Sequence, residues 1–238
     1  MRLQRRRTMQ TVAIISALDE EAAHIADSLD NVTVTERASL SVARGTLTTD
    51  AGEELDVAVT VGGMGLVNAA ATTQFLIDLV HPEAVIFSGI AGNLNKSLHI
   101  NDIVLGKTLR YLDTDMRLVG QWKPGTSEFH SDPALLQIAE GALDEMGINH
   151  IQGTIASGNY FVDTPQKVSQ VIEQTHADAV EMEGAAVAHV AARNDVPALV
   201  IRAMSDSADT DYEEFKDFDI SEYADTAARL AVRILRGM

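Results

Sequence analysis

Two stretches near the C-terminus, AVEMEGAA (Ala179–Ala186) and RAMSDSAD (Arg202–Asp209), decide the fold. Each places a carboxylate within or directly after an apolar run, where burying an unpaired charge is costly. Between them lie a helix-like segment and a second apolar run, ALVI (198–201). This order predicts strand, helix, strand, with Glu183 and Asp206 at carboxyl ends of strands. Open α/β sheets bind ligands at that edge, so the pattern indicates a ligand site more than a scaffold.

The rest of the chain repeats this alternation. TVAIIS (11–16) and AVIFS (84–88) are continuous apolar runs, typical of strands buried on both faces. Further strands are predicted over 39–47 and 55–61, joined as a hairpin, and over 153–156. Helices are predicted over 19–29, 67–79, 133–146, 164–175, 184–193 and 223–236, and 112–131 is expected to be irregular. The sequence therefore predicts an α/β fold with a central mixed β-sheet flanked by helices.

Composition sets the domain organisation and limits the partners. The chain has 238 residues, of which 46% are hydrophobic, enough to bury a full core. No linker, repeat or low-complexity segment interrupts 9–238, so we expect one domain preceded by a disordered basic extension, 1–8. The formal net charge of −17 argues against nucleic-acid and anionic-membrane surfaces.

The content of cysteine and histidine limits the metal chemistry and bears on the cellular compartment. The chain has no cysteine, which excludes disulfides and thiolate sites, and its seven histidines are scattered without ligand spacing. We therefore expect no metal site. The basic start resembles a signal peptide, but 11–17 is too short for its apolar region. With no run long enough to span a membrane, the expectation is a soluble, cytoplasmic protein.

Two glycine-rich segments follow predicted strands. Gly63–Asn68 opens a helix, as a dinucleotide fingerprint does, but Asn68 occupies the third glycine position and no ribose-binding acid follows at the expected distance. A turn that lets the backbone approach a ligand is therefore favoured. Gly89–Gly92 is interpreted either as a plain turn or as a tight loop with amides facing a cavity.

Three acids are candidates for chemistry, and each also has a purely structural interpretation. Glu21 could be a solvated acid at a helix start, and Asp206 could cap a short helix. Glu181 and Glu183 would share one face of an extended strand, or the alternation fails at the strand end and one of the two is simply solvated. A shared position at the carboxyl edge of the sheet favours a catalytic cluster containing Glu21, Glu183 and Asp206.

The loop SGNYFVD (Ser157–Asp163) carries two adjacent aromatic side chains in a chain with few of them. Packing of one ring into the core is the simpler interpretation. A stacking platform for a flat base is the alternative.

Together these blocks resemble the nucleoside phosphorylase/nucleosidase superfamily, over nearly the whole chain from Thr11 to the final helix. The matching blocks are SALDEE (16–21), GMG (63–65), SGIAG (88–92), SGNYFV (157–162), VEMEG (180–184) and RAMSD (202–206). The resemblance implies a homodimer that hydrolyses an adenine N-glycosidic bond without a cofactor, acting on a small-molecule nucleoside.

The resemblance also implies a role for each site residue. Asp206 would be the general acid that protonates adenine N7, and Glu21 would position and deprotonate the attacking water. Cleaving a ribosyl bond needs one acid and one base facing each other across it. Glu183 would accept hydrogen bonds from the ribose hydroxyls. The other expected substrate-binding residues are Met182 at the sugar, Phe161 stacked on adenine, Val162 reading its edge, and Ile90, Gly92 and Met64. Ile90 departs from relatives that carry a hydroxyl residue there.

Several alternatives remain open. A purine or uridine phosphorylase would hold phosphate with arginines, but the segments after the first strand and over 84–92 contain no arginine or lysine. An aminofutalosine nucleosidase would use the same adenine and ribose contacts. A non-catalytic adenosine-binding module would not need both Glu21 and Asp206. A dinucleotide-dependent oxidoreductase is disfavoured by Asn68.

Overall fold

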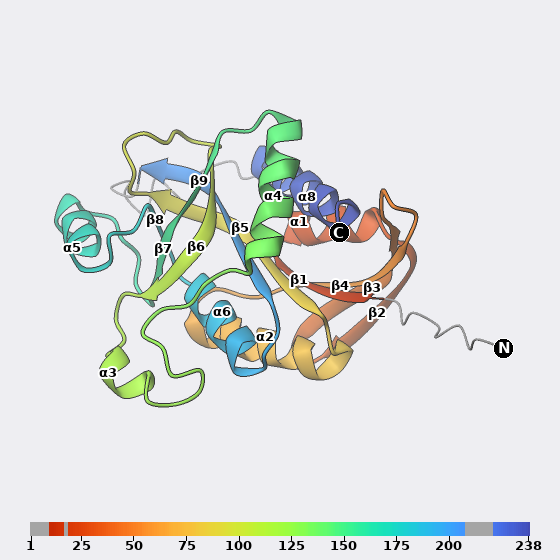
Figure 1. Cartoon of the computed structure of the whole chain (residues 1–238), viewed down its shortest axis with the longest axis horizontal. Coiled ribbons are helices and arrows are strands. Elements are labelled where there is room, and N and C mark those ends of the chain that lie inside the picture. Colours follow the sequence, from red (N-terminus) through yellow and green to blue (C-terminus); the bar gives the residue numbers. More distant parts are fainter. Residues whose placement is uncertain (1–9, 17–18, 208–220) are drawn as a thin grey trace.

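The computed structural model describes residues 10–16, 19–207 and 221–238. Within them, nine strands form one mixed sheet with helices on both faces (Figure 1). The strands are β1 (Gln10–Ser16), β2 (Asp30–Arg37), β3 (Leu40–Thr48), β4 (Glu54–Val61), β5 (Ala84–Asn93), β6 (Ile103–Tyr111), β7 (His150–Ser157), β8 (Ala179–Glu181) and β9 (Ala198–Ser207). The helices are α1 (Asp19–Asp27), α2 (Leu66–Val80), α3 (Met116–Val119), α4 (Pro133–Met146), α5 (Pro165–Thr175), α6 (Gly184–Arg193) and α8 (Ser221–Arg236). The expected α/β class is confirmed. The basic extension over 1–8 lies outside the described residues, and the division into extension and domain stays a prediction.

The sheet has an open half and a closed half. The strand order β2-β3-β4-β1-β5 forms the open half, in which β1 pairs in parallel with both β4 and β5. Beyond it, β5 pairs with β9 along its length and with β8 at its end. Because β9 pairs with β6, β6 with β7 and β7 with β8, these five strands close into a ring. Most predicted site residues lie on or directly after ring strands, whereas Glu21 and Met64 follow β1 and β4 of the open half.

Two apolar cores cover the two faces of the sheet. One packs α1, α4 and α8 against it through residues such as Ile25, Leu143 and Ile234. The other packs α2 and α6 through residues such as Leu76 and Val187. Figure 1 shows these two sets of helices on opposite sides of the strands. Buried on both faces, β1 and β5 are apolar without alternation, as their sequences predict.

The structure corrects the prediction at Gly89–Gly92. These residues form no turn but continue β5 as far as Asn93. They pair with β9 throughout, and Gly92 also pairs with Val180 of β8 on its other side. Glycine is tolerated here because cross-strand pairing fixes the conformation that the residue itself does not.

Other elements differ in extent or were missed. The expected helix over 19–29 ends at Asp27, and β9 continues beyond the predicted 198–201. Neither β2 nor β6 was predicted, and the irregular segment 112–131 contains the single turn α3. Among the described residues, no helix is both long enough and apolar enough to cross a membrane.

Candidate active site

The carboxyl ends of three parallel strands lie at one edge of the sheet. Ser16 of β1 is in register with Val61 of β4 and with Ser88 of β5. The Gly62 N–H, in the loop after β4, donates to the Ser16 carbonyl at 3.0 Å. The segments that follow β1 and β4 therefore start side by side, at the edge where open α/β sheets bind ligands.

Glu21 lies in the first turn of α1, directly after β1. It is fully buried, whereas Asp19 and Glu20 on the same turn are exposed. The interpretation of Glu21 as a solvated helix-start acid is therefore wrong. A carboxylate is seldom buried without a specific use, because removing its charge from water is expensive.

Glu183 lies in the turn between β8 and α6. Its Oε1 accepts the Gly65 N–H at 2.8 Å, which ties it to the loop between β4 and α2. Its Oε2 faces the Met182 N–H at 3.3 Å and Arg202 Nη2 at 3.7 Å. Burial, and then the negative charge of Glu181, raise the pKa of Glu183 to about 7, against the lowering effect of Arg202. Glu183 is thus a carboxyl group close to its titration point near neutral pH.

Behind Glu183 lies a buried ion pair that the sequence reasoning missed. Arg202 is completely buried on β9, 4.0 Å above the ring of Phe87, and its Nε donates to Glu181 Oε2 at 3.0 Å. The other oxygen of Glu181 accepts the Ser157 hydroxyl. The available signal was a basic residue inside the apolar run LVIRAM (199–204), because a buried arginine needs a buried acid.

Asp206 is the penultimate residue of β9, and its side chain lies outside the described part of the chain. Its backbone is in register with Gly92 of β5, which pairs on its other side with Val180 of β8. Next to it, the Ser205 hydroxyl donates to the Ala91 carbonyl at 3.2 Å. The backbone position of Asp206 is therefore fixed at the site edge of the sheet. Ile90 is half-buried and packs against the core that contains α1.

The loop after β7 divides into a buried and a more open part. Val162 is buried in a small core with Leu94, Val171 and Val180, so its side chain is structural. Phe161 is half-buried, and its carbonyl accepts Lys167 Nζ at 3.1 Å. Core packing in this loop thus belongs to Val162, which leaves Phe161 as the candidate stacking surface.

The loop Gly62–Gly65 is a glycine turn, as the sequence favoured over a dinucleotide fingerprint. Gly63 and Gly65 have φ angles of 73° and 94°, a region that L residues seldom adopt. Met64 between them is 71% exposed, while Met182 beside Glu183 is half-buried. Because the loop presents the Gly65 amide to Glu183, it belongs to the same site.

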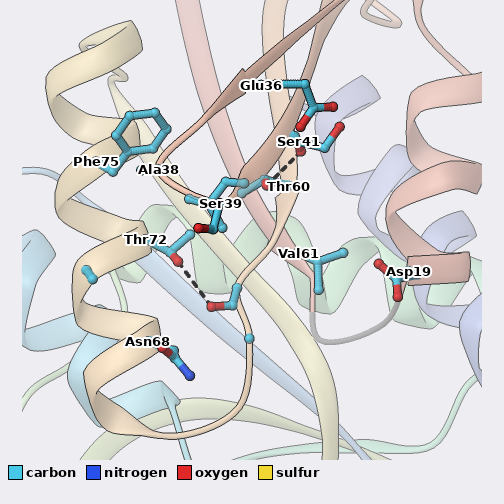
Figure 2. Close-up of a pocket in the computed structure, with 14 residues that line it drawn as sticks. Asp19, Glu36, Ala38, Ser39, Ser41, Thr60, Val61, Asn68, Thr72 and Phe75 are labelled. Atoms are coloured by element: carbon cyan, nitrogen blue, oxygen red, sulfur yellow. Dashed lines mark hydrogen bonds between the residues drawn. The ribbon is translucent and has the colours of Figure 1, made fainter.

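A cavity of about 540 Å³ opens on another side of this loop (Figure 2). There the Thr72 hydroxyl holds the Gly62 carbonyl at 3.1 Å, and Thr60 holds Ser41 at 2.8 Å. Among the described residues that line it, none is a predicted site residue. The cavity is therefore a neighbour of the predicted site. No group of three or more potential metal ligands occurs within the described part of the chain.

Comparison with known proteins agrees with this architecture. Residues 11–236 match the model of the phosphorylase superfamily, and the chain belongs to that superfamily. It is 35% identical to a 5′-methylthioadenosine/S-adenosylhomocysteine nucleosidase of Shewanella sediminis, over 89% of this chain and 91% of the relative. The superfamily that the sequence motifs indicated is thereby confirmed.

Solved structures are similar over almost the whole chain. One is the nucleosidase of that same name from Neisseria meningitidis, in complex with methylthio-immucillin-A, with 30% identity and a TM-score of 0.87. It is matched over 97% of this chain and 100% of its own. A futalosine hydrolase of Helicobacter pylori follows with 27% identity and a TM-score of 0.84, over 97% and 99% of the two chains.

Proposed function

We propose that this protein hydrolyses the bond between adenine and ribose in nucleosides of the 5′-methylthioadenosine/S-adenosylhomocysteine type, releasing adenine and a 5-thioribose. The observation that carries the proposal is a pair of carboxylates: Glu21 is buried directly after β1, and the half-buried Glu183 accepts the Gly65 N–H of the loop after β4. Relatives named as nucleosidases of these substrates support it.

The reaction needs groups that act on the base, the sugar and the water. As adenine leaves, its ring gains negative charge and the sugar becomes a cation. Asp206 would donate a proton to N7, for which its pKa must be raised by its surroundings. Glu21 would orient a water and take its proton. The negative charge of Glu183 would stabilise the cationic sugar while accepting its hydroxyls.

The remaining predicted residues would bind without reacting. Phe161 would stack on adenine while the Val162 backbone reads its edge, and Met182 would lie against the sugar. Gly92 and Ile90 would border the base, next to the strand that carries Asp206. The exposed Met64 would contribute to an apolar surface for the 5′ substituent. No cofactor takes part in these steps.

Water is favoured over phosphate as the nucleophile. Phosphate-using relatives would need free arginines in the site. Arg202, which lies beside Glu183, is fully buried and engaged by Glu181. Its charge is therefore committed to a protein carboxylate rather than available to an anion.

The test is to incubate the purified protein with methylthioadenosine in phosphate-free buffer and to identify the sugar by chromatography. We expect adenine and free methylthioribose. Inosine should be a poor substrate, because its O6 only accepts hydrogen bonds and cannot replace the N–H donor of adenine's amino group. A requirement for phosphate together with release of a sugar 1-phosphate would replace this proposal with the phosphorylase alternative.

Aminofutalosine is the second candidate substrate, supported by the match to a futalosine hydrolase. It belongs in the same assay, and the ratio of kcat/KM for the two nucleosides decides between them. We also propose a cytoplasmic location, which cell fractionation would test.

A further inference from the structure

Glu181 carries more interactions than a structural ion pair requires. Its side chain accepts the Ser157 hydroxyl, two donors of Arg202, and the backbone N–H groups of Glu183 and Gly184 at 3.1 and 2.8 Å. One carboxylate thus joins the end of β7, the middle of β9 and the first turn of α6. Space around it is tight: a β-carbon on Gly184 would meet Val200 at 2.9 Å and Glu181 Oε2 at 3.3 Å.

Arg202 lies close to two carboxylates, Glu181 and Glu183, but interacts more strongly with Glu181. It forms hydrogen bonds to Glu181 through Nε and Nη2, whereas its shortest approach to Glu183 is 3.7 Å. Among Glu181, Glu183 and Arg202, only Arg202 is positively charged, and its hydrogen bonds go to Glu181. Glu183 is left with backbone donors, the amides of Gly65 and Met182.

We propose that Glu181 is a positioning residue for the reaction: it commits Arg202 to itself, so that the charge of ionised Glu183 is not paired with Arg202 and is directed at the sugar. This inference rests on the proposed function of the site. Without Glu181, Arg202 would pair with Glu183, balance its negative charge and draw it away from the ribose hydroxyls. The transition state would then lose a negative charge that balances the sugar cation.

The charge arrangement gives this role a distinctive readout. The charged groups that act on Glu183 in the described structure are Glu181 from β8 and Arg202 from β9, while the loop before α2 and the turn before α6 present backbone amides. Removing the charge of Glu181 removes a repulsion and leaves the attraction of Arg202. The acidic limb of the kcat/KM profile, which reports groups of the free enzyme, should therefore move to lower pH.

The experiment compares Glu181→Gln with Glu181→Asp and a matched control, Asp56→Asn. Asp56 is also a buried acid held by an arginine, Arg44 at 2.5 Å, and a hydroxyl, Thr11 at 3.0 Å, but it lies near the amino end of β4. We expect Glu181→Gln to lower kcat about 10- to 100-fold and to move the acidic limb down by about one pH unit. Glu181→Asp should keep the limb, and Asp56→Asn should change neither value per folded molecule.

A double variant, Glu181→Gln with Arg202→Gln, addresses the case in which an unpaired arginine prevents folding. With both charges removed, the limb should return towards its wild-type position, because burial still raises the pKa of Glu183. An unshifted limb in Glu181→Gln, or an equal shift in Asp56→Asn, would overturn the inference.

Titration of Glu183 by carboxyl ¹³C NMR, assigned with Glu183→Gln, measures the same shift without catalysis. If the wild-type protein hydrolysed no nucleoside, the proposed function would fail. The NMR shift would still decide whether Glu181 controls the charge of Glu183.

Discussion

Glu20 and Glu21 are neighbours in one helical turn, yet only Glu21 is buried. Both are glutamates at adjacent positions in the first turn of α1, so variants of the two residues form a matched pair. Replacing Glu21 by glutamine keeps its shape and removes its capacity to accept a proton. We expect Glu21→Gln to lose about 10²- to 10⁴-fold in kcat while retaining nucleoside binding. Glu20→Gln should behave as wild type in the same steady-state assay, and equal activity of both variants would remove Glu21 from the mechanism.

Glu183 makes stability depend on pH in a direction that follows from its raised pKa. Its pKa lies near 7 in the folded protein and ordinarily near 4.5, so the folded state favours the protonated form. Its contribution to stability is complete below about pH 4.5 and is lost as the pH rises through about 7. Glu183→Gln, which is always neutral, should therefore gain stability relative to wild type at pH 8, on the order of 2 kcal/mol, and little at pH 4.

Thermal unfolding at the two pH values measures this difference as a change in Tm. Glu20→Gln again serves as the control, because it makes the same substitution at an exposed position. A Glu183→Gln variant with the same Tm difference at pH 4 and pH 8 would contradict the expected pKa.

Among elements, α2 begins in an unusual way. Its N-cap residue, Gly65, has no side chain to offer, and the first free amides are accepted instead by Glu183 and by Asn159 at 3.2 Å. Two segments distant in sequence thus complete the helix start, at the position where anions are favoured by the helix dipole. The geometry of α2 and the orientation of Glu183 therefore depend on each other.

Gly65→Ala tests this dependence. The φ angle of 94° is strained for alanine, although an added β-carbon would meet only Asn159 Oδ1 at 3.6 Å. We expect a loss of about 1–2 kcal/mol in the free energy of unfolding and a higher KM, because the amide that holds Glu183 shifts. Gly141→Ala, in α4 with open space around it, should instead be neutral or stabilising by up to about 1 kcal/mol. Chemical denaturation and steady-state kinetics of both variants measure these effects.

The elements that the sequence predicted well are those with strong local signals. Helix α4 has the predicted bounds because Asp132 caps it, Pro133 begins it and Gly147 ends it. Strand β2 was missed because all its residues are exposed: its short alternation of Val32 and Val34 with threonines carries no buried apolar face. The continuation of β5 through glycines arises from pairing with β8 and β9, which local sequence cannot reveal. At the site, isolated carboxylates were recognisable, but the pairing of Arg202 with Glu181 joins residues 21 positions apart on β9 and β8, which local sequence does not reveal.

At the scale of the whole molecule, apolar side chains exposed on and beside α2 and α3 are candidates for a self-association surface. Val67 at the start of α2 is 78% exposed, and Leu118 and Trp122 in and after α3 are 64% and 77% exposed. With the exposed Met64, these support the homodimer that the family resemblance implies. Met116 is half-buried against the core that contains α2, so it contributes less to this exposed apolar surface.

We expect a dimer at micromolar concentration by light scattering, with a buried interface of at least about 1,200 Å². Val67→Glu and Trp122→Glu should shift the equilibrium towards monomer, because a charge in an apolar interface is costly. Val34→Glu, on the edge strand β2 and 59% exposed in wild type, is the matched control and should leave the dimer intact. A fully active wild-type monomer would contradict the expected assembly.

The closed ring of strands also governs the order in which the protein can be made. Ala91 and Ser205, which meet across β5 and β9, are separated by 114 positions in the chain. During synthesis, the β1, β4 and β5 strands can pair early, but β5 and β6 must wait for β9 before their remaining edges are covered. Unpaired strand edges are sites of aggregation. A ribosome that stalls after α6 would therefore release a chain whose ring of strands is still open, a natural substrate for chaperones and proteases.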